Sequence, residues 1–247
     1  GKYNVIQDLT PISFFKTFID DDYRIDNTVL LRHDPRPHIL PFRTYHVEHD
    51  GAMVGGRPEV TFAVPLETIK EAAITCLKAG RSVWFGCCVQ RYFNVDYGVL
   101  APEAFDYESL LHMPIGMSKA DELTTMISMP THAMAIVGVD LDINNKPIKW
   151  RIENSWGVWD DEEDQGYLQM SDAWFDKYVY EVLVPQDSLS ESVQELYTKY
   201  EFDPIILPYI DPVGTCARQV AHDKATLMLK SKARHGLQKK DDHRLKE

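Results

Sequence analysis

The sequence predicts an α+β protein, with helices mainly in its first half and a run of strands in its second. The clearest helix is predicted over 66–79, where Leu66, Ile69 and Ala73 recur at three- and four-residue spacing. Apolar strands are predicted over 82–89, 133–141, 148–153, 166–170 and 178–184. Successive strands of this kind favour an antiparallel, barrel-like sheet with flanking helices.

The first element is a helix that begins after Thr10. Threonine suits the N-cap, and Pro11 suits the first helical position, where its missing N–H costs nothing. Phe14, Phe15 and Phe18 then give the helix an apolar face.

Two short strands follow, over 27–31 and 44–47. The first ends before the prolines of the segment 33–37 (HDPRP), because proline cannot donate a ladder hydrogen bond. The helix over 66–79 ends at Gly80, and the strand over 82–89 (SVWFGCCV) is so continuously apolar that we expect both its faces to be buried.

Shorter helices are predicted over 105–111, 119–128 and 173–177. Ser118, with Asp121 three residues later, caps the second of these. The segment 185–192 is predicted to be a boundary, followed by an arm over 185–217 and a tail over 218–247.

The composition excludes several classes of protein. The chain has 247 residues, a net charge of −12 and 44% hydrophobic residues, so it is neither disordered nor collagen-like. No apolar run is long enough for a membrane span, and residues 1–10 lack the pattern of a signal peptide. The acidic body also argues against nucleic-acid binding over the whole surface.

Charge is uneven along the chain. The last 30 residues carry nine basic and four acidic side chains, a net of +5, against −17 for the residues before them. Such a tail is typical of a solvated appendage, with contact to nucleic acid or another acidic partner as the sharper alternative.

The four cysteines do not form a disulfide framework. Cys76, Cys87, Cys88 and Cys216 are few and irregularly spaced, which indicates reduced thiols in a cytoplasmic protein. Core packing is the expected role of Cys76 and Cys87.

The strongest chemical signal is a histidine and an asparagine on neighbouring strands. His132 begins one predicted strand, and Asn154 follows the next. A hairpin places these side chains within reach, so that the amide oxygen of Asn154 fixes the tautomer of His132 and leaves its other nitrogen to serve a nucleophile. Trp156 is expected to cover this hydrogen bond. Without the sequence motifs around these two residues, His132 would be interpreted as a structural histidine.

The motifs around His132 and Asn154 favour a catalytic role instead. The segments 129–134 (MPTHAM) and 149–157 (KWRIENSWG) resemble the His and Asn blocks of papain-like cysteine peptidases, and in particular the bleomycin hydrolase and aminopeptidase C branch. Further words fall in the same order as in that branch, namely LTP at 9–11, HDPRP at 33–37, MVGGR at 53–57, VWFGC at 83–87, GYL at 166–168, WF at 174–175 and PIILPYIDPVG at 204–214.

The resemblance implies a papain-like fold seen through its C-terminal, barrel-like half, with residues 1–184 in the peptidase domain. It implies a cysteine aminopeptidase that acts on peptides and amide-bearing drugs by a Cys–His–Asn mechanism, with His132 and Asn154 as catalytic residues. It also implies a cytoplasmic homohexamer with an internal channel, needing no metal and no organic cofactor. Membranes are not an expected partner.

The chain differs from the pattern of this branch in three places. Cys88 stands where the branch usually has an acid, which alters the local charge. No cysteine precedes Cys76, although papain-type enzymes place the nucleophile 130–150 residues before the histidine. The chain also continues beyond Gly214, near which the family ends, so no terminal carboxylate stands there to bind a substrate amine.

Two functions follow from these departures. The first is an aminopeptidase whose cysteine lies on a separate N-terminal segment, so that this chain alone is inactive. The alternative is a catalytically dead relative that serves as an oligomeric interaction or nucleic-acid-binding subunit.

Overall fold

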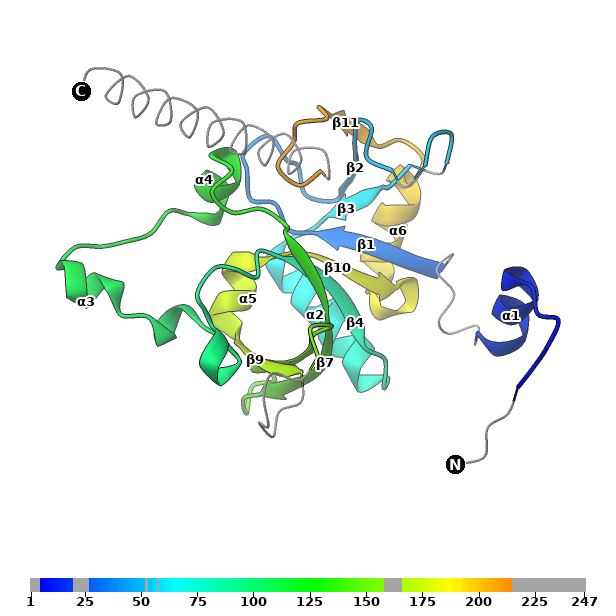
Figure 1. Ribbon diagram of the computed structural model, residues 1–247. Coiled ribbons are helices and arrows are strands. Elements are labelled where there is room, and N and C mark those ends of the chain that lie inside the picture. Colours follow the sequence, from blue (N-terminus) through cyan, green and yellow to red (C-terminus); the bar gives the residue numbers. More distant parts are fainter. Residues whose placement is uncertain (1–4, 20–26, 52, 57, 158–165, 215–247) are drawn as a thin grey trace, which may run out of the picture.

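The computed structural model describes residues 5–19, 27–51, 53–56, 58–157 and 166–214 (Figure 1). Within these residues helices pack against one mixed sheet, so the predicted α+β class is confirmed. The strand order in this sheet is β11-β2-β3-β1-β10-β4-β7-β8-β9-β6-β5. The pairs β1–β3, β2–β11 and β6–β9 are parallel and the other neighbours are antiparallel.

The strands are β1 (Thr28–Arg32), β2 (Arg43–Val47), β3 (Thr61–Ala63), β4 (Val83–Cys87), β5 (Phe93–Asn94), β6 (Val99–Leu100), β7 (His132–Leu141), β8 (Pro147–Glu153), β9 (Tyr167–Ser171), β10 (Val179–Pro185) and β11 (Ile205–Leu207). The helices are α1 (Pro11–Phe18), α2 (Leu66–Lys78), α3 (Tyr107–Leu111), α4 (Lys119–Thr124), α5 (Asp172–Tyr178) and α6 (Glu191–Tyr200). Short 3-10 turns lie at Val95–Tyr97, Pro102–Ala104 and Gln186–Ser188.

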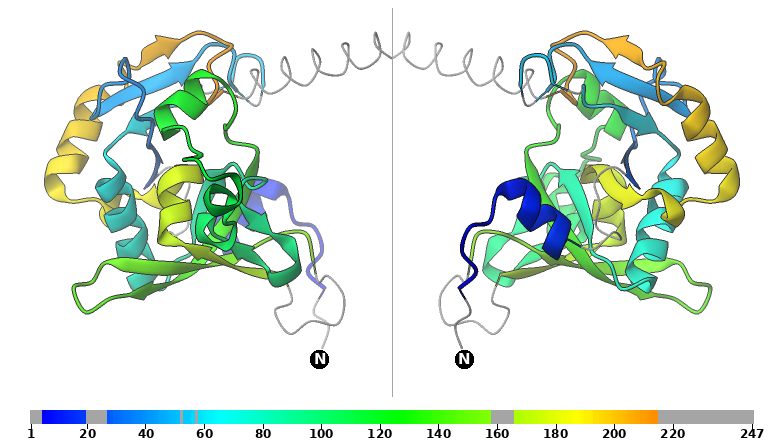
Figure 2. Two further views of the ribbon diagram at one scale, coloured as in Figure 1. Left: turned by 90° about the vertical axis from the view of Figure 1, so that its left-hand side faces the viewer. Right: turned by 90° about the vertical axis from the view of Figure 1, so that its right-hand side faces the viewer.

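The core lies between the sheet and helices α2, α5 and α6. The Trp150 ring stacks on Phe175 of α5 with centroids 4.8 Å apart, and Tyr197 of α6 meets Phe62 edge-on at 5.4 Å. The indole N–H of Trp174 donates to the Arg91 carbonyl at 2.7 Å, so this fully buried ring leaves no polar atom unpaired. In Figure 2, α6 and α2 follow one another along the same side of the molecule.

Helix α1 is formed as the sequence predicts but packs differently. Thr10 caps it, and Thr10 and Ser13 form a reciprocal capping box. None of its residues is buried, and Phe14, Phe15 and Phe18 remain 49%, 38% and 46% exposed. Figure 1 shows α1 to one side of the sheet, so its apolar face does not contribute to the described core.

Three local expectations are corrected. The strand over 82–89 is not buried on both faces, because Trp84 in its middle is 42% exposed. The helix predicted over 119–128 ends at Thr124, since Met126 takes a positive φ of 57° that no helix continues through. The helix predicted over 105–111 begins only at Tyr107, after Asp106 has capped it.

The segment after residue 184 lies on the same sheet. Within 185–214, α6 buries Tyr197 and β11 pairs in parallel with β2, so this part is packed rather than detached. A three-residue strand is too short to give a periodic signal, which is why the sequence did not predict it. The domain boundary at 184 and the direction of the arm toward the active site stay predictions, and the tail over 218–247 lies outside the described residues.

No helix among the described residues is long and apolar enough to cross a membrane.

Candidate active site

His132 is the first residue of β7 and is held between two strands. Its register partner on β4 is Cys87, and the preceding residue, Thr131, donates its N–H to the Cys87 carbonyl at 2.8 Å. The thiol of Cys87 in turn donates to the His132 carbonyl at 3.6 Å. The backbone of His132 is therefore fixed by β4, and its side chain is half-buried.

Asn154 lies beside it because β7 and β8 form a hairpin. Ala135 pairs with Glu153, so the residue after β8 comes level with the start of β7. The hairpin turn is stabilised by Asp142, whose carboxylate accepts from the N–H groups of Asn144 and Lys146, both at 2.8 Å. These hydrogen bonds to backbone hold the pKa of Asp142 below its usual range.

The predicted hydrogen bond is present. His132 Nε2 lies 2.9 Å from Asn154 Oδ1. The same Oδ1 accepts the backbone N–H of Ser155 at 2.9 Å, which only the oxygen of the amide can do. Oδ1 is thus the atom facing the ring, so Nε2 must carry the proton that it donates.

The consequence is a defined tautomer. With its proton on Nε2, a neutral His132 keeps the lone pair of Nδ1, and Nδ1 has no hydrogen-bond partner among the described residues. A ring that is oriented on one side and open on the other can accept a proton from a nucleophile and return it to a leaving group.

Trp156 contacts the imidazole ring, as the sequence predicts. The two ring centroids are 4.8 Å apart with an interplanar angle of 35°, and Phe93 lies 6.2 Å behind the indole. Trp156 remains 43% exposed, so it covers part of the His132 ring while staying in contact with solvent itself.

The described cysteines are buried, reduced thiols. Cys76, Cys87 and Cys88 are all free and at most 3% exposed. Burial raises the pKa of Cys87 well above its ordinary value, with Cys88 adding to the effect. A buried thiol that resists ionisation is a poor nucleophile, so core packing is the role that fits Cys87. Cys216 lies outside the described residues.

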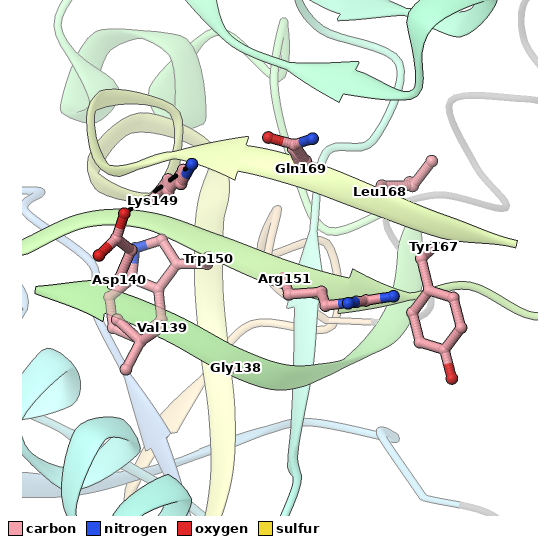
Figure 3. Close-up of a pocket in the computed structure, with 9 residues that line it drawn as sticks. All are labelled: Gly138, Val139, Asp140, Lys149, Trp150, Arg151, Tyr167, Leu168 and Gln169. Carbon is pink, nitrogen blue, oxygen red and sulfur yellow. Dashed lines mark ion pairs between the residues drawn. The ribbon is translucent and has the colours of Figure 1, made fainter. Parts of the chain in front are cut away.

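A separate hollow of about 390 Å³ lies further along the hairpin, on β7, β8 and β9 (Figure 3). Arg151 lies over the Tyr167 ring at 4.4 Å, and Lys149 reaches Asp140 at 3.8 Å. Gly138 leaves space opposite Arg151 because it has no side chain. Neither His132 nor Asn154 lines this hollow, so it is distinct from the candidate catalytic pair.

No cluster of three or more metal-ligating side chains occurs among the residues that the structure describes.

Sequence reasoning missed a second set of polar residues, at the end of β1, which β10 and β4 separate from β7 in the sheet. His33 and the charged residues Arg32, Asp34 and Arg36 are buried or half-buried in the structure, and so is Lys119 of α4. The motif HDPRP at 33–37 contributes to the family resemblance, but its sequence does not indicate a chemical role. The only available signal was a cluster of charges at the end of a buried strand, whose partners come from distant parts of the chain.

The comparisons with known proteins decide the family. Residues 1–214 match the model of the Peptidase C1-like family. The chain belongs to this family. Among its relatives, bleomycin hydrolase from Homo sapiens is 36% identical over 218 residues, and aminopeptidase C from Streptococcus thermophilus is 38% identical over 216 residues. Each alignment covers 87% of this chain and 47% of the relative, so the chain spans about half of their length.

A solved structure agrees with this assignment. The crystal structure of PepW from Lactobacillus rhamnosis HN001 superposes with a TM-score of 0.79 at 34% identity, covering 86% of this chain and 46% of that one. The predicted bleomycin hydrolase and aminopeptidase C resemblance is therefore confirmed, together with the papain-like fold class and the peptidase family.

Proposed function

We propose that this chain provides the His–Asn half of a cysteine aminopeptidase of the bleomycin hydrolase type. One observation carries the proposal: His132 is oriented by Asn154 through Nε2, while Nδ1 is left open. That is the arrangement a Cys–His–Asn mechanism needs, and relatives at 36–38% identity are named bleomycin hydrolase and aminopeptidase C.

The nucleophile is proposed to come from a Cys-bearing N-terminal segment. Cys87 is buried and hydrogen-bonded to the His132 carbonyl, so it does not face Nδ1. In the proposed reaction Nδ1 takes the thiol proton, the thiolate attacks the scissile carbonyl, and the imidazolium returns the proton to the leaving amine. Water then hydrolyses the acyl-enzyme, and Asn154 holds the ring throughout.

The first test is the coding sequence upstream of Gly1. A Gly-x-Cys-Trp segment there would favour the enzyme, whereas its absence from the gene would favour the catalytically dead subunit. The second test is activity on an aminoacyl-coumarin amide. We expect none from the 247-residue chain alone, and we expect activity when the Cys-bearing segment is supplied.

His132→Ala in the complemented protein should lower kcat/KM by at least about 10³-fold, because general acid–base catalysis contributes about 10²–10⁴-fold and the thiolate is lost as well. The matched control is His49→Ala, since His49 is 74% exposed in the turn after β2, away from His132. Activity of the isolated chain that disappears in a Cys88→Ala variant would contradict the proposal.

Nucleic-acid contact through the basic tail, a hexameric assembly and a cytoplasmic location remain proposals. They rest on the charge of residues 218–247 and on the resemblance, and an electrophoretic shift assay with and without the tail separates the first from a solvated appendage.

A further inference from the structure

Four buried charges meet at the end of β1. Asp34 accepts hydrogen bonds from the guanidinium and the backbone N–H of Arg36, the shortest at 2.6 Å, and Arg32 lies 3.2 Å from the same carboxylate. Asp211, far along the chain, accepts from Arg32 and from Arg36, each at 3.0 Å. All four side chains are at most 7% exposed. The segment after β1 is thereby locked in place, because two cations and two anions are paired with one another.

His33 lies inside this locked segment and contacts Lys119. The Nζ of Lys119 is 3.0 Å from His33 Nδ1, and it also reaches the carbonyls of Asp176 at 3.0 Å and Val179 at 2.5 Å. An ammonium has three protons to donate, and here it finds three acceptors, one from each of β1's end, α5 and β10. Lys119 also lies 4.8 Å from the centre of the Tyr180 ring.

Lys119 begins the stretch of chain that ends at His132. It is the first residue of α4, and Figure 1 shows the chain running from α4 directly into β7. A second attachment comes just before His132, where the Tyr180 hydroxyl and the Ser128 hydroxyl are 2.6 Å apart. Ser128 is 1% exposed, and only three residues separate it from His132.

We propose that Lys119 is a positioning residue for His132, acting as a buried pin that joins the stretch 119–131 to the locked segment at the end of β1. Lys119 fixes one end of this stretch on His33 and on two carbonyls, and Tyr180 fixes the other end through Ser128. β4 holds the backbone of His132, and the two attachments hold the chain that leads into it, so the ring keeps its 2.9 Å contact with Asn154. The catalytic meaning of this role rests on the proposed function.

The electrostatics agree with that arrangement. Burial, together with the positive charge of Lys119, lowers the pKa of His33 to about 3, so His33 is neutral and Nδ1 can accept. Burial also lowers the pKa of Lys119 to about 7, while Asp176, Asp34 and Glu122 work in the opposite direction. Below about pH 7 Lys119 is a cation, and its burial is tolerated because all three protons are donated to acceptors.

The test reads the His132–Asn154 hydrogen bond directly in the full 247-residue chain by NMR. The proton on His132 Nε2 should give a downfield signal that disappears in a His132→Gln variant. In Lys119→Met we expect the solvent exchange of this proton to rise at least tenfold, because the stretch before His132 loses its pin. Tyr180→Phe keeps the ring over Lys119 but removes the bond to Ser128, and we expect a smaller rise.

The matched control is Lys70→Met. Lys70 is also a partly buried lysine with carboxylate partners on α5, 2.7 Å from Asp172, and it lies near the Phe175 ring. Among the described residues Lys70 makes no hydrogen bond or ion pair with the stretch 119–131, and it acts on Lys119 only through its charge, which lowers the pKa of that lysine. Its removal should therefore leave the contacts of Lys119 in place, and the His132 signal should exchange as in the unmodified chain.

Equal exchange in Lys119→Met and in the unmodified chain would overturn the proposal, and so would equal acceleration in Lys119→Met and Lys70→Met. If Lys119→Met does not fold, Tyr180→Phe serves as the test. Solvent exchange of the His132 Nε2 proton at the same rate in Tyr180→Phe as in the unmodified chain would then overturn the proposal. A missing Nε2 proton signal in the unmodified chain would instead count against the His–Asn pair itself, and hence against the proposed function.

Discussion

The candidate catalytic pair and the charge cluster at the end of β1 differ in how far their polar groups are paired. His132 is half-buried, and among the residues that the structure describes its side chain is hydrogen-bonded to Asn154 alone, which leaves Nδ1 open. Asp34 and Asp211 are almost fully buried, and each is paired with both Arg32 and Arg36. A general base has to keep a lone pair free to accept a proton. A buried charge, in contrast, is tolerated only when it is paired with an opposite charge or hydrogen-bonded. The first region is therefore expected to control rate and the second to control stability.

The largest expected effect on stability comes from Asp211→Ala. It leaves Arg32 and Arg36 with too little negative charge in a buried site, which typically costs about 3–5 kcal/mol. Asp187→Ala is the matched control, because Asp187 also pairs with an arginine, Arg81, but is 68% exposed, and surface pairs contribute about 0–1 kcal/mol. Urea unfolding measures both, and similar costs for the two variants would contradict the distinction between the two settings.

A pH-dependent effect is expected from His33. Its pKa is about 3 in the folded chain against an ordinary value of 6.5, so the unfolded chain binds the proton more readily as pH falls below 6.5. The folded state should lose up to about 1.4 kcal/mol per pH unit from this group between pH 6.5 and 3. Above pH 6.5 His33 is neutral in both the folded and the unfolded chain, so it no longer lowers the free energy of unfolding.

His33→Asn isolates this contribution, because an amide oxygen can still accept from Lys119 but does not titrate. The free energy of unfolding of the unmodified chain, minus that of His33→Asn, should fall with decreasing pH across this window. A difference that stays constant from pH 6.5 to 4 would show that His33 does not resist protonation.

A smaller effect on rate is expected from Asn154→Ala in the complemented enzyme. Outer-shell partners that orient metal-bound histidines contribute about 10- to 100-fold, and we expect a loss of this order for an amide that orients His132. The loss should therefore be smaller than that of His132→Ala, since Asn154 orients the ring and transfers no proton. Steady-state kinetics on the aminoacyl-coumarin amide measures the ratio, and a loss as large as that of His132→Ala would assign Asn154 a more direct role.

The smallest effect is expected from Lys149→Met. Lys149 is 55% exposed and lies 3.8 Å from Asp140, which is 54% exposed, so solvent screens the pair. Its removal should change the free energy of unfolding by less than about 1 kcal/mol. A cost above about 2 kcal/mol in urea unfolding would show that the face of β7 and β8 around the hollow in Figure 3 is more tightly organised than its exposure indicates.

The sequence alone determined those features that depend on local pattern. The amphipathic helix α2, the caps of α1 and α4 and the hairpin β7–β8 were all predicted, because three- to four-residue spacing, N-cap side chains and turn residues act over a few positions. The pairing of His132 with Asn154 followed from the hairpin, because the two residues are only 22 positions apart.

Only the tertiary structure decided the contacts made across long separations. The bond between Arg32 and Asp211 spans 179 positions, and that between Lys119 and His33 spans 86. The parallel pairing of β11 with β2 and the exposure of α1 and Trp84 were equally invisible in the sequence. Local patterns show which residues have an apolar or charged face, but not what lies opposite that face. The partner of a buried charge is selected by the packing of the whole chain, because burial is what makes an unpaired charge costly.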